Sequence, residues 1–161
     1  MRRGLYIFAA RNTSIIDFLR VSLLNMGDYL WVVDYFFNYG EKGAIPDGVY
    51  SGIGLNEKLN EKIRPLTIRV RKYPKDTDVA SITDLMGYDD YMSSDCLLCI
   101  VAWDMSAIDI YAKDEAEQEA IFANCMKIPH DTLEWTTDEN DGRTGFSPIG
   151  GYGDGYPPPV S

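Results

Sequence analysis

The stretch CLLCIVAWDMSAIDIYAKDE, residues 96–115, predicts two strands that pair with each other. Residues 96–103 are almost entirely apolar, which is typical of a central strand, and residues 106–112 alternate between apolar and polar side chains. The link Asp104-Met105 is short, so we expect an antiparallel hairpin. Asp114 follows as the N-cap of a helix over 115–128, whose first turn carries acidic residues that suit the helix dipole.

Further elements are predicted on both sides of this hairpin. Apolar or alternating runs predict strands over 4–10, 28–39, 66–73 and 132–137, and weaker patterns leave short strands open over 49–54 and 143–147. Helical spacing predicts helices over 13–26, with Gly27 as its C-cap, and over 56–63 and 81–92. Together they predict an α+β fold, a mostly antiparallel sheet with helices packed on one face in a two-layer sandwich. A mixed sheet stays possible if the first strand–helix–strand unit pairs in parallel.

The strand over 66–73 alternates cleanly. Ile68 and Val70 share one face, and Arg69 and Arg71 share the other. This pattern predicts one face that contacts the core and one basic face that contacts water.

Length and composition favour one domain. A chain of 161 residues suits a single domain, which we place at 1–149. Residues 150–161, GGYGDGYPPPVS, are predicted to form a flexible Gly/Pro-rich tail. The apolar run at 5–10 is too short for a signal peptide, and no run approaches the ~20 residues that span a bilayer. We therefore expect a cytoplasmic protein that does not contact membranes.

Charge is distributed very unevenly along the chain. Residues 1–75 hold 12 Lys and Arg against 7 Asp and Glu, whereas residues 76–161 hold 3 against 18. The formal net charge of −10 disfavours binding to nucleic acid, because phosphates would be repelled. The acidic half would attract a basic partner, although acidic surfaces also serve solubility alone.

The patterns that carry chemistry are weak. Cys96, Cys99, Cys125 and His130 formally supply a zinc ligand set, but residues three apart in a strand point to opposite faces, so core packing is favoured. The turn TDENDGRT, residues 137–144, begins like a calcium loop but has Ile149 at the twelfth position. We therefore predict no metal, no cofactor and no catalytic residue, and leave enzymatic activity undecided, leaning against it.

Aromatic and acidic residues supply the candidate binding site. Aromatic side chains crowd the strand over 28–39 on both faces, and a cluster of them exposed beside acidic groups would form a protein interface. The candidate binding residues are Trp31, Tyr35, Asp89, Asp90, Asp138, Asp141 and Arg143.

Three segments carry a family resemblance: RRGLYIF (2–8), CLLCIVAWDMSAIDIYAKDE (96–115) and TDENDGRTGFS (137–147). They resemble an uncharacterised family of small bacterial proteins from Bacillus-type Firmicutes, a domain of unknown function. The resemblance is strongest over 96–147, and TDEND followed by Arg143 and Thr144 is its most specific motif. The Gly/Pro-rich tail departs from the family pattern. The resemblance implies a cytoplasmic bacterial or phage-borne protein and assigns no activity.

Three functional hypotheses follow. The leading one is a small acidic protein-binding module, such as an immunity or inhibitor protein that acts through an acidic face. The second is a domain, or an enzyme of unknown reaction, that binds a phosphate- or carboxylate-bearing small molecule between the aromatic strand and Arg69 and Arg71. The third is a subunit of a structural homo-oligomer.

Overall fold

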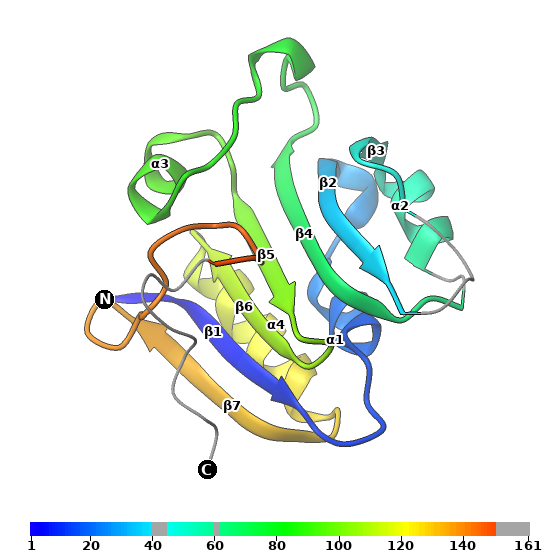
Figure 1. The fold of residues 1–161 in the computed structure, drawn as a ribbon. Coiled ribbons are helices and arrows are strands. Elements are labelled where there is room, and N and C mark those ends of the chain that lie inside the picture. The colour runs from blue at the N-terminus through cyan, green and yellow to red at the C-terminus, as the bar shows by residue number, and fades with distance from the viewer. Residues whose placement is uncertain (40–44, 60–61, 151–161) are drawn as a thin grey trace.

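The computed structural model describes residues 1–39, 45–59 and 62–150. Within these ranges seven strands form one sheet in the order β3-β2-β4-β5-β6-β1-β7 (Figure 1). The strands are β1 (Arg2–Ala9), β2 (Tyr29–Asn38), β3 (Gly48–Ser51), β4 (Pro65–Pro74), β5 (Leu98–Trp103), β6 (Ala107–Ala112) and β7 (His130–Thr137). The helices are α1 (Ile15–Ser22), α2 (Gly52–Leu59), α3 (Tyr88–Ser93) and α4 (Glu115–Met126).

The predicted α+β class is confirmed. Each neighbouring pair of strands in the described sheet runs antiparallel. The alternative of a mixed sheet is wrong, because β1 and β2 lie far apart in the strand order. The hairpin of β5 and β6 forms as expected, with Asp104 and Met105 both at positive φ where the chain reverses.

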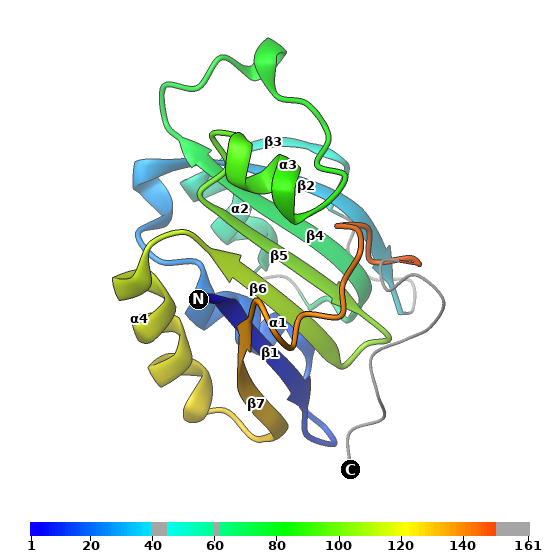
Figure 2. The same ribbon diagram turned by 90° about the vertical axis from the view of Figure 1, so that its left-hand side faces the viewer.

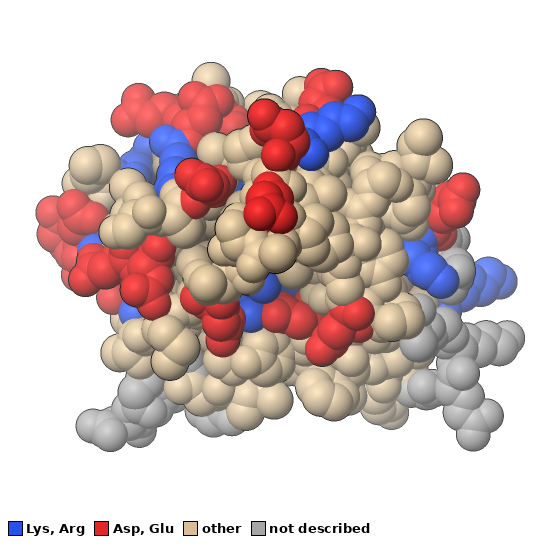
Figure 3. All heavy atoms as spheres, turned by 90° about the horizontal axis from the view of Figure 1, so that it is seen from above, with Lys and Arg blue, Asp and Glu red and all other residues tan. Residues whose placement is uncertain are grey.

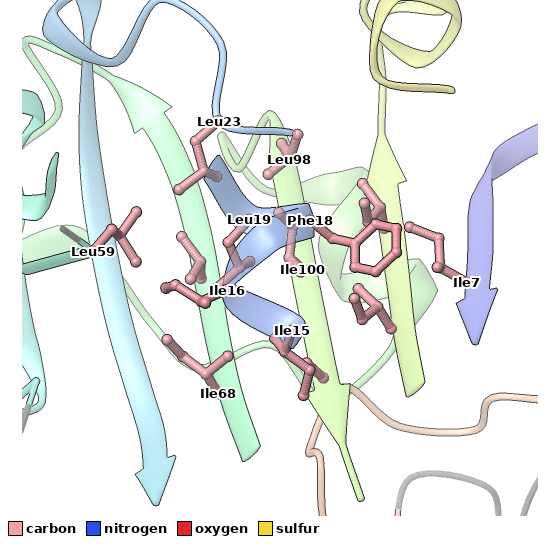
Figure 4. Packing of buried hydrophobic residues seen from close by; sticks show 14 of the residues in the cluster. Ile7, Ile15, Ile16, Phe18, Leu19, Leu23, Leu59, Ile68, Leu98 and Ile100 are labelled. Atoms are coloured by element: carbon pink, nitrogen blue, oxygen red, sulfur yellow. The ribbon is translucent and has the colours of Figure 1, made fainter. Parts of the chain in front are cut away.

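One face of the sheet, which we call the helical face, is covered by α1, α2 and α4 (Figures 1 and 2). Ser14 and Asp17 form a capping box that starts α1. Phe18 and Leu19 of α1 then point onto apolar side chains of the sheet, as Figure 4 shows. This face holds the larger apolar core, and its burial drives the association of helices and sheet.

Two helices differ from their predicted bounds. Helix α1 ends at Ser22 rather than 26, because Asn25 takes the left-handed conformation expected of Gly27 and a 3-10 turn follows at Met26–Asp28. Helix α2 begins at Gly52 rather than 56, after the short strand β3. A Cβ at Gly52 would lie 2.1 Å from the Met26 carbonyl oxygen, so only glycine fits where the two segments touch.

The opposite face, which we call the loop face, is covered by α3 and by irregular chain. The predicted helix over 81–92 is reduced to α3, preceded by a 3-10 turn at Val79–Ser81. The weaker possibility of a strand over 143–147 is wrong in the described chain, where these residues form an irregular segment. Phe146 of that segment is nevertheless buried, stacked on Tyr111 of β6.

The prediction of a water-exposed basic face on β4 is also wrong. Arg69 is 2% exposed and Arg71 is 5% exposed, because residues 82–86 and the segment around Phe146 cross over this part of the sheet. Alternation therefore reported the direction of the side chains correctly but not their burial.

Two further sequence predictions concern the C-terminal tail and membrane-spanning segments. Of the predicted Gly/Pro-rich tail, residues 151–161 lie outside the described residues. Among the described helices, none has the length and apolar character required to cross a bilayer.

Candidate ligand site and acidic surface

A depression of about 590 Å³ lies between β2, β4 and the loop after the Val79–Ser81 turn. Two arginines of β4 form its floor, aromatic residues of β2 form one wall, and the loop forms the other. Its lining residues are Asp34, Tyr35, Phe36, Phe37, Asp47, Arg69, Arg71, Ile82, Thr83 and Asp84. Its volume lies within the range of small-molecule sites, roughly 300–1,000 Å³.

Arg69 is held by carboxylates from two different elements. Its Nε and Nη2 donate to the two carboxylate oxygens of Asp34 on β2, at 2.8 and 2.5 Å. The same Nη2 donates to Oδ1 of Asp84 on the loop at 2.7 Å, and Nη1 donates to the carbonyl oxygen of Phe146. The paired, buried guanidinium has its pKa raised above the usual value: desolvation alone would lower it, but the hydrogen bond and charge of Asp34 outweigh that effect.

Arg71 is less well satisfied. Its Nη1 donates to the Tyr73 hydroxyl at 3.1 Å and to the Thr83 carbonyl at 3.0 Å. Its Nη2 lies 3.7 Å from Asp34, which Arg69 already binds in a bidentate manner. The Nε of Arg71 is fully enclosed and has no acceptor among the residues that the structure describes. An enclosed donor without an acceptor costs about 1–3 kcal/mol, so the site contains unused capacity to bind an oxygen atom.

Tyr35 marks an irregularity of the backbone at the wall of the depression. It has φ of 54° and lies in a bulge where β2 shifts its register against β4. Its carbonyl accepts a 2.6 Å hydrogen bond from the Thr67 hydroxyl, and the Arg69 guanidinium lies 4.9 Å from its ring centroid. Bulges and left-handed residues other than glycine occur preferentially beside functional sites, where they redirect a side chain.

Asp84 reaches the arginines from the solvent side. Its side chain is 57% exposed, in contrast to the arginine that it binds. Partial burial alone would raise the pKa of this carboxyl, but the hydrogen bond and charge of Arg69 lower it below its ordinary value. Asp84 therefore supplies a second negative charge to the arginines of the depression, and it does so from a loop rather than from the sheet.

The loop belongs to a longer acidic segment, residues 76–95, which also includes α3. It contains six aspartates and no Lys or Arg. All six are exposed: Asp76, Asp78, Asp84, Asp89, Asp90 and Asp95. Figure 3 shows acidic side chains outnumbering basic ones over this end of the molecule. The same segment exposes the apolar side chains of Val79, Met86 and Met92.

The predicted binding residues separate into four groups in space. Asp89 and Asp90 lie exposed on α3, in the acidic segment. Tyr35 lies at the depression, beside the predicted ligand residues Arg69 and Arg71. Trp31 lies in the core of the helical face and donates from Nε1 to the Met26 carbonyl, so its ring does not reach the surface.

Asp138, Asp141 and Arg143, the fourth group, bind other parts of the chain. Asp138 and Asp141 both accept from Arg3, and Asp141 also accepts from the Tyr111 hydroxyl. The hydrogen bond from Arg3 lowers the pKa of Asp138 below its ordinary value. The Nε of Arg143 donates to Asp109 at 2.8 Å within a buried ion pair. The motif TDENDGRT therefore ties the chain after β7 to the loop face.

The remaining candidates are the thiols and the possible metal ligands. Cys96, Cys99 and Cys125 are free and buried. Burial raises the pKa of the Cys96 and Cys125 thiols to about 11. In the described part of the chain no three His, Cys, Asp or Glu side chains converge as a metal site would require.

Sequence reasoning missed the carboxylates that hold the arginines. Asp34 lies opposite Arg69 in the pairing of β2 with β4, but 35 residues separate them, so no local pattern links the two. Asp84 lies in a loop, where no periodicity applies. Asp109 alternates with Ile108 and Ile110, and this pattern predicts the face of the sheet to which Asp109 points. It does not predict that Asp109 pairs with the buried Arg143.

The fold and site define a small α+β protein with a covered sheet face that contains paired arginines. The family model "Protein of unknown function (DUF2691)" matches residues 12–147, so the chain belongs to this family. The predicted resemblance to an uncharacterised bacterial family is thereby confirmed.

The chain is also similar to one curated bacterial protein. The chain is 32% identical over 66 residues to "Uncharacterized protein YncE" of Bacillus subtilis (strain 168). That alignment covers 41% of this chain and 43% of the relative, so less than half of either protein is compared. No solved structure matches this chain.

Proposed function

We propose that this protein is a small cytoplasmic binding protein, of the immunity or inhibitor type, that recognises a basic protein through its acidic segment (residues 76–95). The observation that carries the proposal is the composition of that segment's surface. The segment exposes six aspartates and contains no Lys or Arg, and it also exposes the apolar side chains of Val79, Met86 and Met92.

These two properties act on different steps of binding. Acidic groups speed the encounter with a basic partner and disfavour acidic ones. Apolar side chains then supply contact area: Met86 is 72% exposed, and methionine adapts its shape to a partner surface. The segment also lacks the regular sheet or long helix that would restrict its adjustment to a partner.

A pull-down with matched baits tests the proposal. The first bait is the wild type; the second is the triple variant D89N/D90N/M92S. The control, D131N/E134Q, removes two exposed acids from β7 at the far edge of the sheet. We expect a stoichiometric basic protein on the wild type and control baits, at least about tenfold less of it on the triple variant, and elution by salt. Equal recovery on all three baits, or recovery of no stoichiometric protein, would contradict the proposal.

Self-association is a second candidate, favoured by a different surface. Val49 of the edge strand β3 and Ile53 of α2, which follows it, are exposed at one edge of the sheet. Light scattering of the wild type and of Ile53→Glu distinguishes the candidates: a dimer that the substitution dissociates favours this edge as an interface, whereas a monomeric wild type rejects it.

A further inference from the structure

We propose that the depression between β2 and β4 binds a small carboxylic acid with an aromatic or branched apolar group, whose carboxylate replaces the Asp84 side chain on Arg69 and reaches Arg71. This inference concerns a small ligand on the loop face and does not depend on the proposed protein partner. It rests on the charge, the unmet hydrogen bond and the shape of the depression.

The charges of the floor are balanced only with the help of the loop. Arg69 and Arg71 are both more than nine-tenths buried, and Asp34 is the carboxylate that the sheet itself supplies to them. The second carboxylate is that of Asp84, which is mostly exposed. A ligand carboxylate can therefore take its position without leaving Asp84 buried and unpaired, because the displaced side chain returns to water. Asp47, which also lines the depression, is exposed at the rim and does not neutralise the floor.

The unmet hydrogen bond lies on Arg71. Its Nε is enclosed without an acceptor, while its Nη1 is occupied by the Thr83 carbonyl of the same loop. A carboxylate is a planar acceptor with two oxygens, which matches the fork of a guanidinium. Entry of such a group would supply the missing acceptor, and the Thr83 carbonyl, in an exposed residue, would bond to water instead.

The shape of the depression indicates the rest of the ligand. Tyr35, Phe36 and Phe37 line it on one side and Ile82 on the other, so an apolar group would contact aromatic and aliphatic side chains. The loop that must move is attached by Asp84 to Arg69 and by Thr83 to Arg71, and the side chains of Ile82 and Leu85 pack in the apolar cluster of the loop face. Few attachments hold it, so opening is cheaper here than at the helical face.

Titrations followed by amide NMR test the inference, with benzoate, acetate and inorganic phosphate as probes. The proteins are the wild type, D84N, R71M and the control D89N. D84N removes the competing carboxylate, R71M removes the guanidinium whose Nε lacks an acceptor among the described residues, and D89N removes one charge from the acidic segment outside the depression. Circular dichroism establishes that each variant is folded.

We expect benzoate to shift the amide resonances of residues 34–37 and 69–71 and of the loop 82–86. Because D84N removes an intramolecular competitor, its affinity for benzoate should exceed that of the wild type and of D89N by about tenfold. R71M should lose the response, and acetate should bind more weakly than benzoate because it lacks the ring.

Three outcomes would overturn the inference. One is the absence of benzoate shifts in residues 34–37 and 69–71 of both wild type and D84N. The second is equal affinity of D84N and D89N, which would show that Asp84 does not occupy the position. The third is a response to phosphate without a response to benzoate, which would contradict the carboxylate assignment.

Discussion

Both faces of the sheet are buried, but different kinds of chain cover them. The helical face is covered by α1, α2 and α4 and contains the larger apolar core. The loop face is covered by the short α3 and irregular segments, and besides its smaller apolar cluster it encloses Arg69, Arg71, Asp109 and Arg143. The helical face therefore stabilises the fold by apolar burial, whereas the loop face depends on charges that are paired across the sheet.

This difference bears on function. The helical face is mostly apolar, and its buried Lys72 is already paired with Glu117 of α4, so little chemistry is left there to recognise a ligand. The loop face holds two arginines at a depression, an enclosed donor without an acceptor in the described chain, and a carboxylate that reaches Arg69 from solvent. The part of the fold that is least regular is thus the part with the capacity to bind.

The largest expected effect is on the helical face. Leu19→Ala should lower the free energy of unfolding by about 4 kcal/mol, since a fully buried side chain on α1 leaves a cavity that helix and sheet cannot fill. The matched variant on the loop face, Leu85→Ala, should cost only about 2 kcal/mol because a loop can collapse into the space. Urea denaturation of both variants measures the difference. Equal losses would mean that both faces are equally rigid.

The next effect tests charge pairing on the loop face. Asp109→Ala should cost about 3 kcal/mol, because it leaves the buried guanidinium of Arg143 without its carboxylate. The double variant D109L/R143M should recover most of this loss, since apolar side chains of similar size remove both charges together. A double variant as unstable as the sum of the two single variants would show that the pair does not act as a unit.

A smaller effect is expected at the depression. Arg71→Met removes the bonds from Nη1 to Tyr73 and Thr83 but also the enclosed Nε that lacks an acceptor among the described residues, so the loss and the gain partly offset each other. We therefore expect the free energy of unfolding to stay within about 1 kcal/mol of the wild-type value. A loss much larger than this in urea denaturation would make Arg71 a structural residue.

The smallest effect concerns pH. The pKa of Asp84 is lowered in the folded protein from 3.8, because the bond and charge of Arg69 outweigh desolvation. A carboxylate with a lowered pKa stabilises the fold above its unfolded pKa and loses that contribution as the pH falls through its folded pKa. Asp84→Asn should therefore be less stable than the wild type at pH 6, with the difference disappearing below 3.8. A difference that persists at low pH would exclude this ion pair as its cause.

The sequence predicted the strands and helices better than the burial of their side chains. The hairpin of β5 and β6 follows from a local apolar run, and α1 follows from the capping residues before Ile15. Arg69 and Arg71 were expected to contact water, because alternation reports which way a side chain points and not what lies above it. Their burial depends on a loop that carries no periodic signal.

The candidate site was predicted only in part. The position between the aromatic strand and Arg69 and Arg71 matches the depression, and Tyr35 lies in it. Asp34 and Asp84 were not predicted, since strand register and loop path bring them there from distant parts of the sequence. Trp31 was proposed as a binding residue from composition alone, and composition does not separate buried from exposed aromatic side chains.

The loop face should also be where the native protein opens, and two cysteines report this directly. Cys96 lies under the loop face and Cys125 in the core of the helical face. Burial raises the pKa of both thiols to about 11, so neither should react while it is enclosed. Opening removes this effect from both, so a difference in alkylation must come from a difference in opening.

Alkylation under native conditions, assigned by peptide mass spectrometry, is the most direct measurement of this claim. The account predicts that Cys96 is labelled faster than Cys125. Labelling of Cys125 at the same rate or faster would contradict it, because the helical face would then open as readily as the face that contains the arginines.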